Sequence, residues 1–295
     1  MSFKVDDKAF TESILELIRI TSTDLSHDAV KSIERACENE DADTPARTVF
    51  EQILENISLA KNKSTPICQD TGTCIFYVTI PVGVSMRQIQ SIIASAVKEA
   101  TIKAYLRPNA VHSVTGNNSG DNIGDGSPQI HFDEWDQNAV KISLMLKGGG
   151  CENVSTQYNL PDTTLKAGRN LDGVYKCVVD SVNNAQGLGC APGLIGVGIG
   201  GDRAAGALLA KKQIFRDIED KNEYRELADL ENTLYTDLNT LGIGPMGFGG
   251  KTTVLGVKIN QAHRLPASFF VSIAYMCWAA RRRSMVISEN GVKYA

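Results

Sequence analysis

Cys74-Ile75-Phe76-Tyr77-Val78-Thr79-Ile80 is the stretch that decides the fold class of this chain. All seven side chains are apolar, aromatic or β-branched, which is typical of a buried strand, and Pro81 and Gly83 end the run. Ser85 then predicts the N-cap of a long helix. The apolar face of that helix comprises Ile89, Ile92, Ile93, Ala96, Val97 and Ala100. A strand followed by an amphipathic helix favours a mixed α/β fold.

The sequence on either side predicts more of both elements. The first 60 residues are expected to be helical, and Thr44 and Pro45 mark the N-cap and first turn of one helix there. Residues 113–128 hold too many turn formers for a regular element, so a functional loop is expected. Further helices are predicted at 172–185, 202–213 and 223–240, and further strands at 140–146, 194–199, 253–260 and 269–276.

Composition narrows the class of protein. The chain has 295 residues, 42% of them apolar, and a formal net charge of −4, which argues against nucleic acid as a partner. It has no apolar run long enough to cross a membrane and no signal-peptide pattern, so a cytoplasmic location is expected. We see no internal repeat or linker. A single α/β domain over 1–295, with a helical N-terminal region of about 1–60, is the simplest prediction.

Gly196-Val197-Gly198-Ile199-Gly200-Gly201 matches the spacing of a dinucleotide-binding loop. That motif also requires an acidic residue at the end of a second strand about 20 positions later. The corresponding region, Lys211-Lys212-Gln213-Ile214-Phe215-Arg216, does not resemble such a strand end. Two alternatives remain: close packing of backbone, or a helix N-terminus that offers amides to a substrate carboxylate.

Gly249-Gly250-Lys251-Thr252 resembles the end of a phosphate-binding P-loop. The P-loop needs a glycine five residues before Gly250, but that residue is Pro245. Nucleotide hydrolysis is therefore not expected.

Seven cysteines, an odd number, argue against a complete set of disulfides. Three stand in polar or glycine-rich surroundings: Cys68 before Gln69-Asp70-Thr71-Gly72, Cys190 before Ala191-Pro192-Gly193, and Cys277 shortly before Arg281-Arg282-Arg283. Three thiolates can hold three corners of an iron–sulfur cluster and leave the fourth iron open. The spacing itself carries no cluster signature, since the chain contains no C-x-x-C pair.

Several motifs, in order from about Thr44 to Arg283, resemble the α part of the class I, iron–sulfur-dependent fumarate hydratase and L(+)-tartrate dehydratase family. The stretches that carry the resemblance are Pro66-Ile67-Cys68-Gln69-Asp70-Thr71-Gly72-Thr73, Leu106-Arg107-Pro108-Asn109-Ala110-Val111, Lys147-Gly148-Gly149-Gly150, Gly196–Gly201 and Leu241-Gly242-Ile243-Gly244-Pro245-Met246-Gly247.

The resemblance implies a [4Fe–4S] cluster on Cys68, Cys190 and Cys277. It also implies that Asp70 and His263 are catalytic residues. The implied substrate-binding residues are Gln69, Asp70, Arg107, Gly149 and His263. Cys151 is expected not to be a ligand, and Cys37, Cys74 and Cys177 to be buried or incidental thiols. The roles of His112 and His131 stay open.

The resemblance further implies a reversible hydro-lyase acting on a C4 dicarboxylate, with fumarate/(S)-malate favoured over L(+)-tartrate. In the family, the proton-transfer residue lies in a β part that this sequence lacks. We therefore expect a β-type subunit as partner, with α–β pairs assembled into a higher oligomer. A chain that keeps the fold and only binds a cluster or a dicarboxylate is the remaining alternative.

Overall fold

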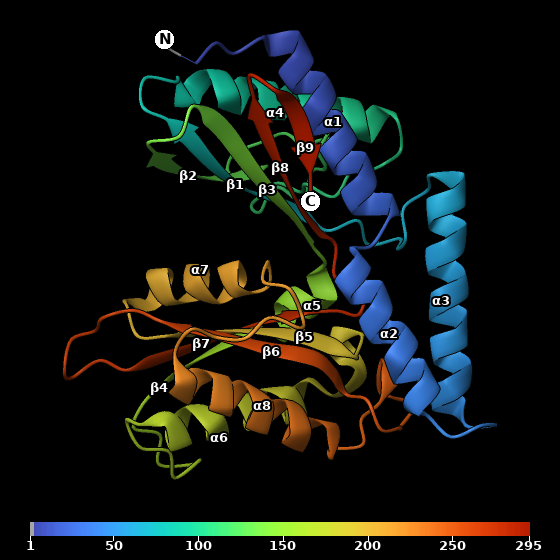
Figure 1. The fold of residues 1–295 in the computed structure, drawn as a ribbon, viewed down its shortest axis with the longest axis vertical. Helices are drawn as coiled ribbons and strands as arrows, with labels where there is room; N and C mark the ends of the chain where they lie inside the picture. The colour runs from blue at the N-terminus through green and yellow to red at the C-terminus, as the bar shows by residue number, and fades with distance from the viewer. Residues whose placement is uncertain (1–2) are drawn as a thin grey trace. The chain divides into compact units, whose positions relative to one another are not determined.

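The computed structural model describes residues 3–295, which form two compact units (Figure 1). Of these residues, unit 1 comprises 3–26, 56–149 and 281–295, and unit 2 comprises 27–55 and 150–280. Each unit has its own β-sheet with helices packed on it, so the predicted mixture of helix and strand is confirmed. The single domain over 1–295 stays a prediction.

Unit 1 is built on a five-stranded sheet with the order β2-β1-β3-β8-β9. β1 runs parallel to β2 and antiparallel to β3. β1 is buried along almost its whole length, which explains its uninterrupted apolar sequence. The strands are β1 (Thr73–Pro81), β2 (Gln129–Trp135), β3 (Ala139–Lys147), β8 (Arg282–Ser288) and β9 (Gly291–Tyr294).

Helices α1 (Asp7–Thr23) and α4 (Met86–Ile102) pack against each other and share one hydrophobic core with this sheet. The Ser85 hydroxyl accepts a hydrogen bond from the N–H of Gln88, so the predicted cap of α4 is confirmed. Helix α3 (Pro45–Lys63) belongs to unit 2 at its start and to unit 1 from residue 56 onward. Its predicted cap is also present, because Thr44 Oγ1 accepts from the N–H of Arg47.

Unit 2 is built on a four-stranded sheet with the order β4-β7-β5-β6. β5 is parallel to β6 and antiparallel to β7. Helix α7 covers one face of the sheet, and α6 and α8 lie on the other (Figure 1). The strands are β4 (Thr156–Asn159), β5 (Gly193–Ile199), β6 (Val254–Gln261) and β7 (Phe270–Met276). The helices are α2 (His27–Asn39), α5 (Gly149–Asn153, which starts at the end of unit 1), α6 (Leu171–Ala185), η1 (Gln186–Gly189), α7 (Arg203–Gln213), α8 (Arg225–Asn239) and η2 (Pro245–Gly247).

The glycine run of β5 serves close packing against α7. A Cβ on Gly196 would lie 2.1 Å from the carbonyl oxygen of Ala210, and one on Gly198 would lie 2.4 Å from that of Gly206. Real side chains do not approach so closely, so only glycine lets this strand lie against this helix. The packing alternative therefore accounts for Gly196 and Gly198 of the G-x-G-x-x-G pattern.

The second glycine motif binds a carboxylate of the chain itself. Oε1 of Glu40 accepts hydrogen bonds from the N–H of Lys251 (2.8 Å) and of Thr252 (3.1 Å), and Glu40 is buried. The resulting loop leads directly to β6, where Gly193 N–H donates to the carbonyl oxygen of Thr253. Glu40 thus holds the segment on which the start of β5 rests.

Most predicted elements are present, with ends shifted by one or two residues. Residues 113–128 form the predicted loop, held by isolated bridges such as the one between Gly124 and Ser127. Sequence reasoning missed β2, β4, β8 and β9 and did not separate α2 from its neighbours. No helix among residues 3–295 is long and apolar enough to span a bilayer.

Replacing Glu40 by alanine should lower the free energy of unfolding by about 2–3 kcal/mol, because two amides lose a buried acceptor. Chemical denaturation of the full chain measures this loss. The exposed Glu38, replaced by alanine in the same way, is the matched control and should cost less than about 0.5 kcal/mol. Equal losses in the two variants would contradict the role assigned to Glu40.

Candidate active site

The Cys68 loop of unit 1 connects α3 to β1 and is fixed at its start by backbone contacts. The N–H of Ile67 donates to the carbonyl oxygen of Ser22 (3.0 Å), and Nδ2 of Asn56 donates to the carbonyl oxygen of Ile67 (2.9 Å). Ile67 is buried, whereas Cys68 is partly exposed. The loop therefore presents the Cys68 thiol from an anchored backbone.

Both carboxylate oxygens of Asp70 accept hydrogen bonds from backbone amides. Oδ1 accepts from Gly72 N–H (3.0 Å), and Oδ2 accepts from Gly149 N–H (2.7 Å). Gly72 has φ +80°, and a Cβ there would lie 2.8 Å from the backbone of Lys147. Glycine is needed at this point because the two loops touch through their main chains. Asp70 and Gly149, 79 residues apart, are thus brought together.

Thr71 joins the same loop to the segment that contains Arg107. Its hydroxyl oxygen accepts hydrogen bonds from Arg107 N–H and from Asn109 Nδ2, both at 3.0 Å. Nη1 of Arg107 donates to the carbonyl oxygen of Gln69 (3.2 Å), and Arg107 itself is exposed. Unit 1 therefore gathers four predicted site residues, Gln69, Asp70, Arg107 and Gly149, around one loop.

Sheet pairing in unit 2 brings Cys190 and Cys277 together. Cys190 stands three residues before β5, and Cys277 directly follows β7. Because these strands are antiparallel, with Leu194 opposite Met276, the start of β5 lies beside the end of β7. Trp278 N–H donates to the carbonyl oxygen of Cys190 (3.1 Å), which ties the two turns to each other. Cys190 has φ 55° and ψ 62°, the left-handed region.

The ring of Tyr275 lies under the Cys190 turn. A Cβ on Gly189 or on Gly193 would come within 2.5 Å of this ring, so glycines on both sides of Cys190 let the turn pack on it. Tyr275 is completely buried, and within residues 3–295 its hydroxyl has no hydrogen-bond partner. Burial, together with the nearby thiols of Cys277, Cys190 and Cys151, raises the pKa of Tyr275, so the phenol remains a donor.

A buried donor without a partner beside thiols fits a group that carries acceptor sulfur atoms. The donor chemistry of Cys190 and Cys277 suits iron coordinated by thiolates. Residues 3–295 contain no cluster of three His, Cys, Asp or Glu side chains that could chelate a single metal ion. The two neighbouring thiols and the unpartnered phenol fit two ligands of an iron–sulfur group and a donor to it.

The remaining cysteines of the described chain, apart from Cys68, are buried, as Cys277 also is. Cys74 and Cys177 are buried, and burial is the main reason that the pKa of each thiol rises to about 12. The pKa of Cys37 is also raised by burial. All three are protonated at neutral pH, and the prediction that they are buried thiols is confirmed. Cys151 is buried as well.

His263 lies at the opposite end of the unit 2 sheet from Cys190 and Cys277. It follows β6, whose last residue, Gln261, pairs with Ile199 at the far end of β5. Its carbonyl oxygen accepts from Gly201 N–H, and its side chain is exposed. The six steps from Gly193 to Ile199 along β5, at about 3.3 Å each, put about 20 Å between the two ends of this strand. The structure does not bring His263 to the cysteine pair.

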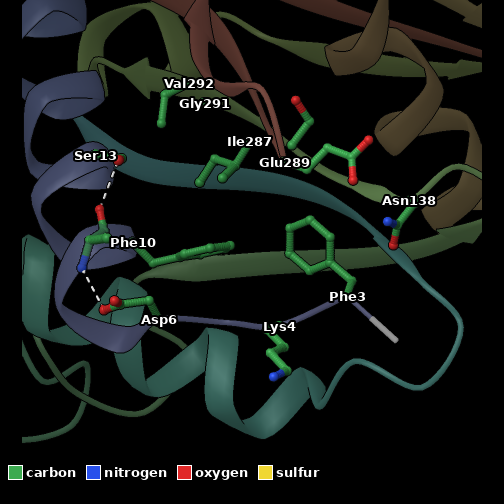
Figure 2. Close-up of a pocket in the computed structure, with 12 residues that line it drawn as sticks. Phe3, Lys4, Asp6, Phe10, Ser13, Asn138, Ile287, Glu289, Gly291 and Val292 are labelled. Carbon is green, nitrogen blue, oxygen red and sulfur yellow. Dashed lines mark hydrogen bonds between the residues drawn. The ribbon is translucent and has the colours of Figure 1, made fainter. Parts of the chain in front are cut away.

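His112 lies beside the polar loop, and His131 lies in β2. Nδ1 of His112 accepts from Thr115 N–H within the polar loop, and the ring of His131 stacks on Tyr77. A pocket of about 810 Å³ beside α1 and β9 contains neither of these histidines (Figure 2). Phe3, Phe10 and Ile287 are among the residues that line it, and no predicted site residue does.

Sequence reasoning missed two residues of these groups, Tyr275 and Arg281. Arg281 is buried and donates to the carbonyl oxygen of Asp70 (2.6 Å). A tyrosine inside an apolar strand and an arginine within a basic run carry no signal of their own. Only the glycines on both sides of Cys190 could have pointed to a large ring beneath that turn.

The chain was compared with known proteins. The model of the fumarate hydratase (Fumerase) family matches residues 11–286. The chain is 49% identical over 282 residues to "Putative fumarate hydratase class I" of Geobacillus stearothermophilus, covering 95% of this chain and 55% of that protein. It is 36% identical over 277 residues to "Putative L(+)-tartrate dehydratase subunit alpha" of Methanocaldococcus jannaschii, covering 92% of this chain and 95% of that protein. It is 33% identical over 286 residues to the L(+)-tartrate dehydratase subunit alpha of Escherichia coli K12, covering 95% and 91%.

Exposure and protonation together predict which thiols react. In the cluster-free chain, iodoacetamide should modify the partly exposed Cys68 and Cys190 at least about 10-fold faster than Cys74 and Cys177. Raising the pH from about 8 to about 10 should not expose Cys74 or Cys177 to alkylation, because their pKa values lie near 12. Peptide mass spectrometry after timed quenching gives the rates, and rapid labelling of Cys74 in the folded chain would contradict this prediction.

Proposed function

Because the chain belongs to the fumarate hydratase (Fumerase) family, we propose that it is the cluster-binding part of a hydro-lyase acting on a C4 dicarboxylate. The observation that carries the proposal is the proximity of Cys190 to Cys277, which the β5–β7 register produces, beside the unpartnered phenol of Tyr275. The proposed cluster ligands are these two cysteines of unit 2 and Cys68 of unit 1. When bound, a [4Fe–4S] cluster with an open iron supplies a Lewis acid for the substrate's hydroxyl.

The residues of unit 1 are the proposed substrate-binding group. Arg107 is exposed and offers a guanidinium to a carboxylate, while its backbone is fixed by Thr71. Asp70 is held in one orientation by two amide donors, so its carboxylate is arranged before substrate arrives. Gln69 and Gly149 border the same loop. We assign Asp70 the role of a catalytic residue that acts on the substrate's hydroxyl group.

Fumarate/(S)-malate is the favoured substrate pair, and L(+)-tartrate is the alternative. Identity is 49% to the protein described as a class I fumarate hydratase, against 36% and 33% to the tartrate dehydratase subunits. One extra hydroxyl is a weak discriminator for a pocket that is not built around it, so the difference in identity is the stronger argument.

A β-type polypeptide is the proposed partner. Two relatives are described as alpha subunits, and this chain spans only 55% of the length of the fumarate hydratase relative. The proton-transfer residue and further carboxylate-binding cations are assigned to that second polypeptide. The reaction at the Asp70 loop would then need both chains.

The function is tested on the chain co-expressed with a β-type partner and reconstituted anaerobically with iron and sulfide. We expect a brown [4Fe–4S] absorption and fumarate hydration that exceeds L-tartrate dehydration. Air should abolish the activity, and ferrous iron with thiol should restore it, because an open iron is exposed to oxidants. A pair that binds cluster and dicarboxylate without turnover would favour the binding-only role, and full activity without the β-type chain would exclude the heteromer.

The Cys190→Ala variant is the decisive control for the cluster. It should lose the [4Fe–4S] absorption and lower activity by roughly 100-fold or more, since the cluster loses a ligand. The matched variant Cys177→Ala removes a buried thiol of the same unit and should keep both signals. An unchanged spectrum in Cys190→Ala would remove the basis of the proposal.

The position of His263 sets a condition on its proposed catalytic role. A residue about 20 Å from the cysteine pair of its own unit can act there only from a second copy of the chain. We therefore expect inactive His263→Asn and Cys190→Ala chains, mixed in equal amounts and reassembled, to regain about a quarter of the wild-type activity. If the mixture stays inactive while each variant still assembles, His263 does not serve the site.

A further inference from the structure

Arg281 is a buried cation without a carboxylate partner. It is 1% exposed and is the largest fully buried side chain among residues 3–295. Within residues 3–295 no carboxylate lies within ion-pair distance of its guanidinium, and Nε has no hydrogen-bond partner. Burying a charge is costly, and arginines usually offset the cost by pairing with carboxylates. The burial of the Arg281 cation at this position therefore needs a structural explanation.

The guanidinium is directed at the Asp70 loop. Nη1 donates to the carbonyl oxygen of Asp70 at 2.6 Å. The backbone of Arg281 is fixed in turn, because its carbonyl oxygen accepts from Leu146 N–H at 3.0 Å. Arg281 thus connects the end of β3 to the loop that carries the proposed catalytic carboxylate.

Gly148 lies between the cation and that carboxylate. A Cβ on Gly148 would be 2.9 Å from Oδ2 of Asp70 and 3.5 Å from Nη2 of Arg281. Both groups therefore face the same side of Gly148, which is buried. Its neighbour Gly149 donates its N–H to the same Oδ2. The cation, the glycine backbone and the carboxylate form one compact unit, which we call the Asp70 clamp: Asp70, Gly148, Gly149 and Arg281.

We propose that Arg281 is a positioning residue that holds Asp70 against the Gly149 amide through its hydrogen bond to the Asp70 carbonyl oxygen. The proposal rests on the proposed hydro-lyase function for its effect on turnover. The contact is made by Nη1 of a planar guanidinium, and lysine keeps the charge without reproducing that geometry. Arg281→Lys should therefore loosen Asp70 without removing the positive charge.

Arg283 in β8, two residues after Arg281, provides a matched control. Its Nη2 donates to the carbonyl oxygen of Leu25 at 2.8 Å and lies 3.5 Å from Oδ2 of Asp24. Like Arg281, it is a largely buried arginine that binds a backbone carbonyl in unit 1. It has no recorded contact with the Asp70 clamp, so Arg283→Lys measures the cost of the substitution itself.

Two measurements on each variant test the proposal. With the reconstituted chain and its β-type partner, Arg281→Lys should lower kcat by about 10- to 100-fold, change KM by less than about 3-fold, and leave the cluster absorption intact. In the isolated full chain, amide exchange at Gly149 should accelerate by about 10-fold or more, because its acceptor is no longer held. Arg283→Lys should leave kcat and Gly149 exchange close to wild type.

Equal effects of the two substitutions, or a normal kcat with unchanged Gly149 exchange in Arg281→Lys, would overturn the proposal. If Arg281→Lys does not fold, Gly148→Ala places a methyl group against Oδ2 of Asp70 and should produce the same two changes. If the wild-type pair turns over no dicarboxylate, the proposed function fails. The Gly149 exchange rates then still decide whether Arg281 positions Asp70.

Discussion

The antiparallel pairing of β5 with β7 is the constraint on which the candidate site depends. These two strands are central in the four-stranded sheet, and their register puts Leu194 opposite Met276. Since one cysteine precedes β5 and the other follows β7, the register alone makes them neighbours across 87 residues of sequence. The same register sends the β6–β7 connection, with His263, to the other end. The β5–β7 pairing therefore places Cys190 beside Cys277 and places His263 at the opposite end of the sheet.

Glycine makes this arrangement sterically possible in both units. In unit 2, Gly189 and Gly193 let the Cys190 turn lie directly on the ring of Tyr275. In unit 1, Gly72 lets the Asp70 loop touch the backbone of Lys147. At each place the missing side chain is replaced by main-chain contact or by an aromatic face, which fixes the turn more tightly than a flexible side chain could. At Gly72, Gly189 and Gly193 the glycines thus serve the close packing of the turns that carry Asp70 and Cys190.

The sequence predicted the elements with strong periodicity and missed those whose pattern is weak. Strand β1 and helix α4 have continuous or amphipathic apolar patterns, and both were located with their boundaries nearly right. Strand β8 begins with two arginines, and β9 has only four residues, so neither has a run of apolar residues to detect. Among the site residues, the sequence identified those that stand close to a motif, such as Asp70, which lies two positions after Cys68. Arg281 was not, because its role comes from a contact across 211 positions that periodicity does not encode.

Glu40 gives the Gly249–Thr252 loop a ligand that the chain always carries. Two amides that resemble a phosphate cradle already hold a carboxylate on the same polypeptide. A tethered group of this kind is present at an effective local concentration in the millimolar range or above, which puts a free anion at a disadvantage in competing for the same amides. The loop matches only the last part of the P-loop pattern, and the two amides are already occupied by a carboxylate of the same chain.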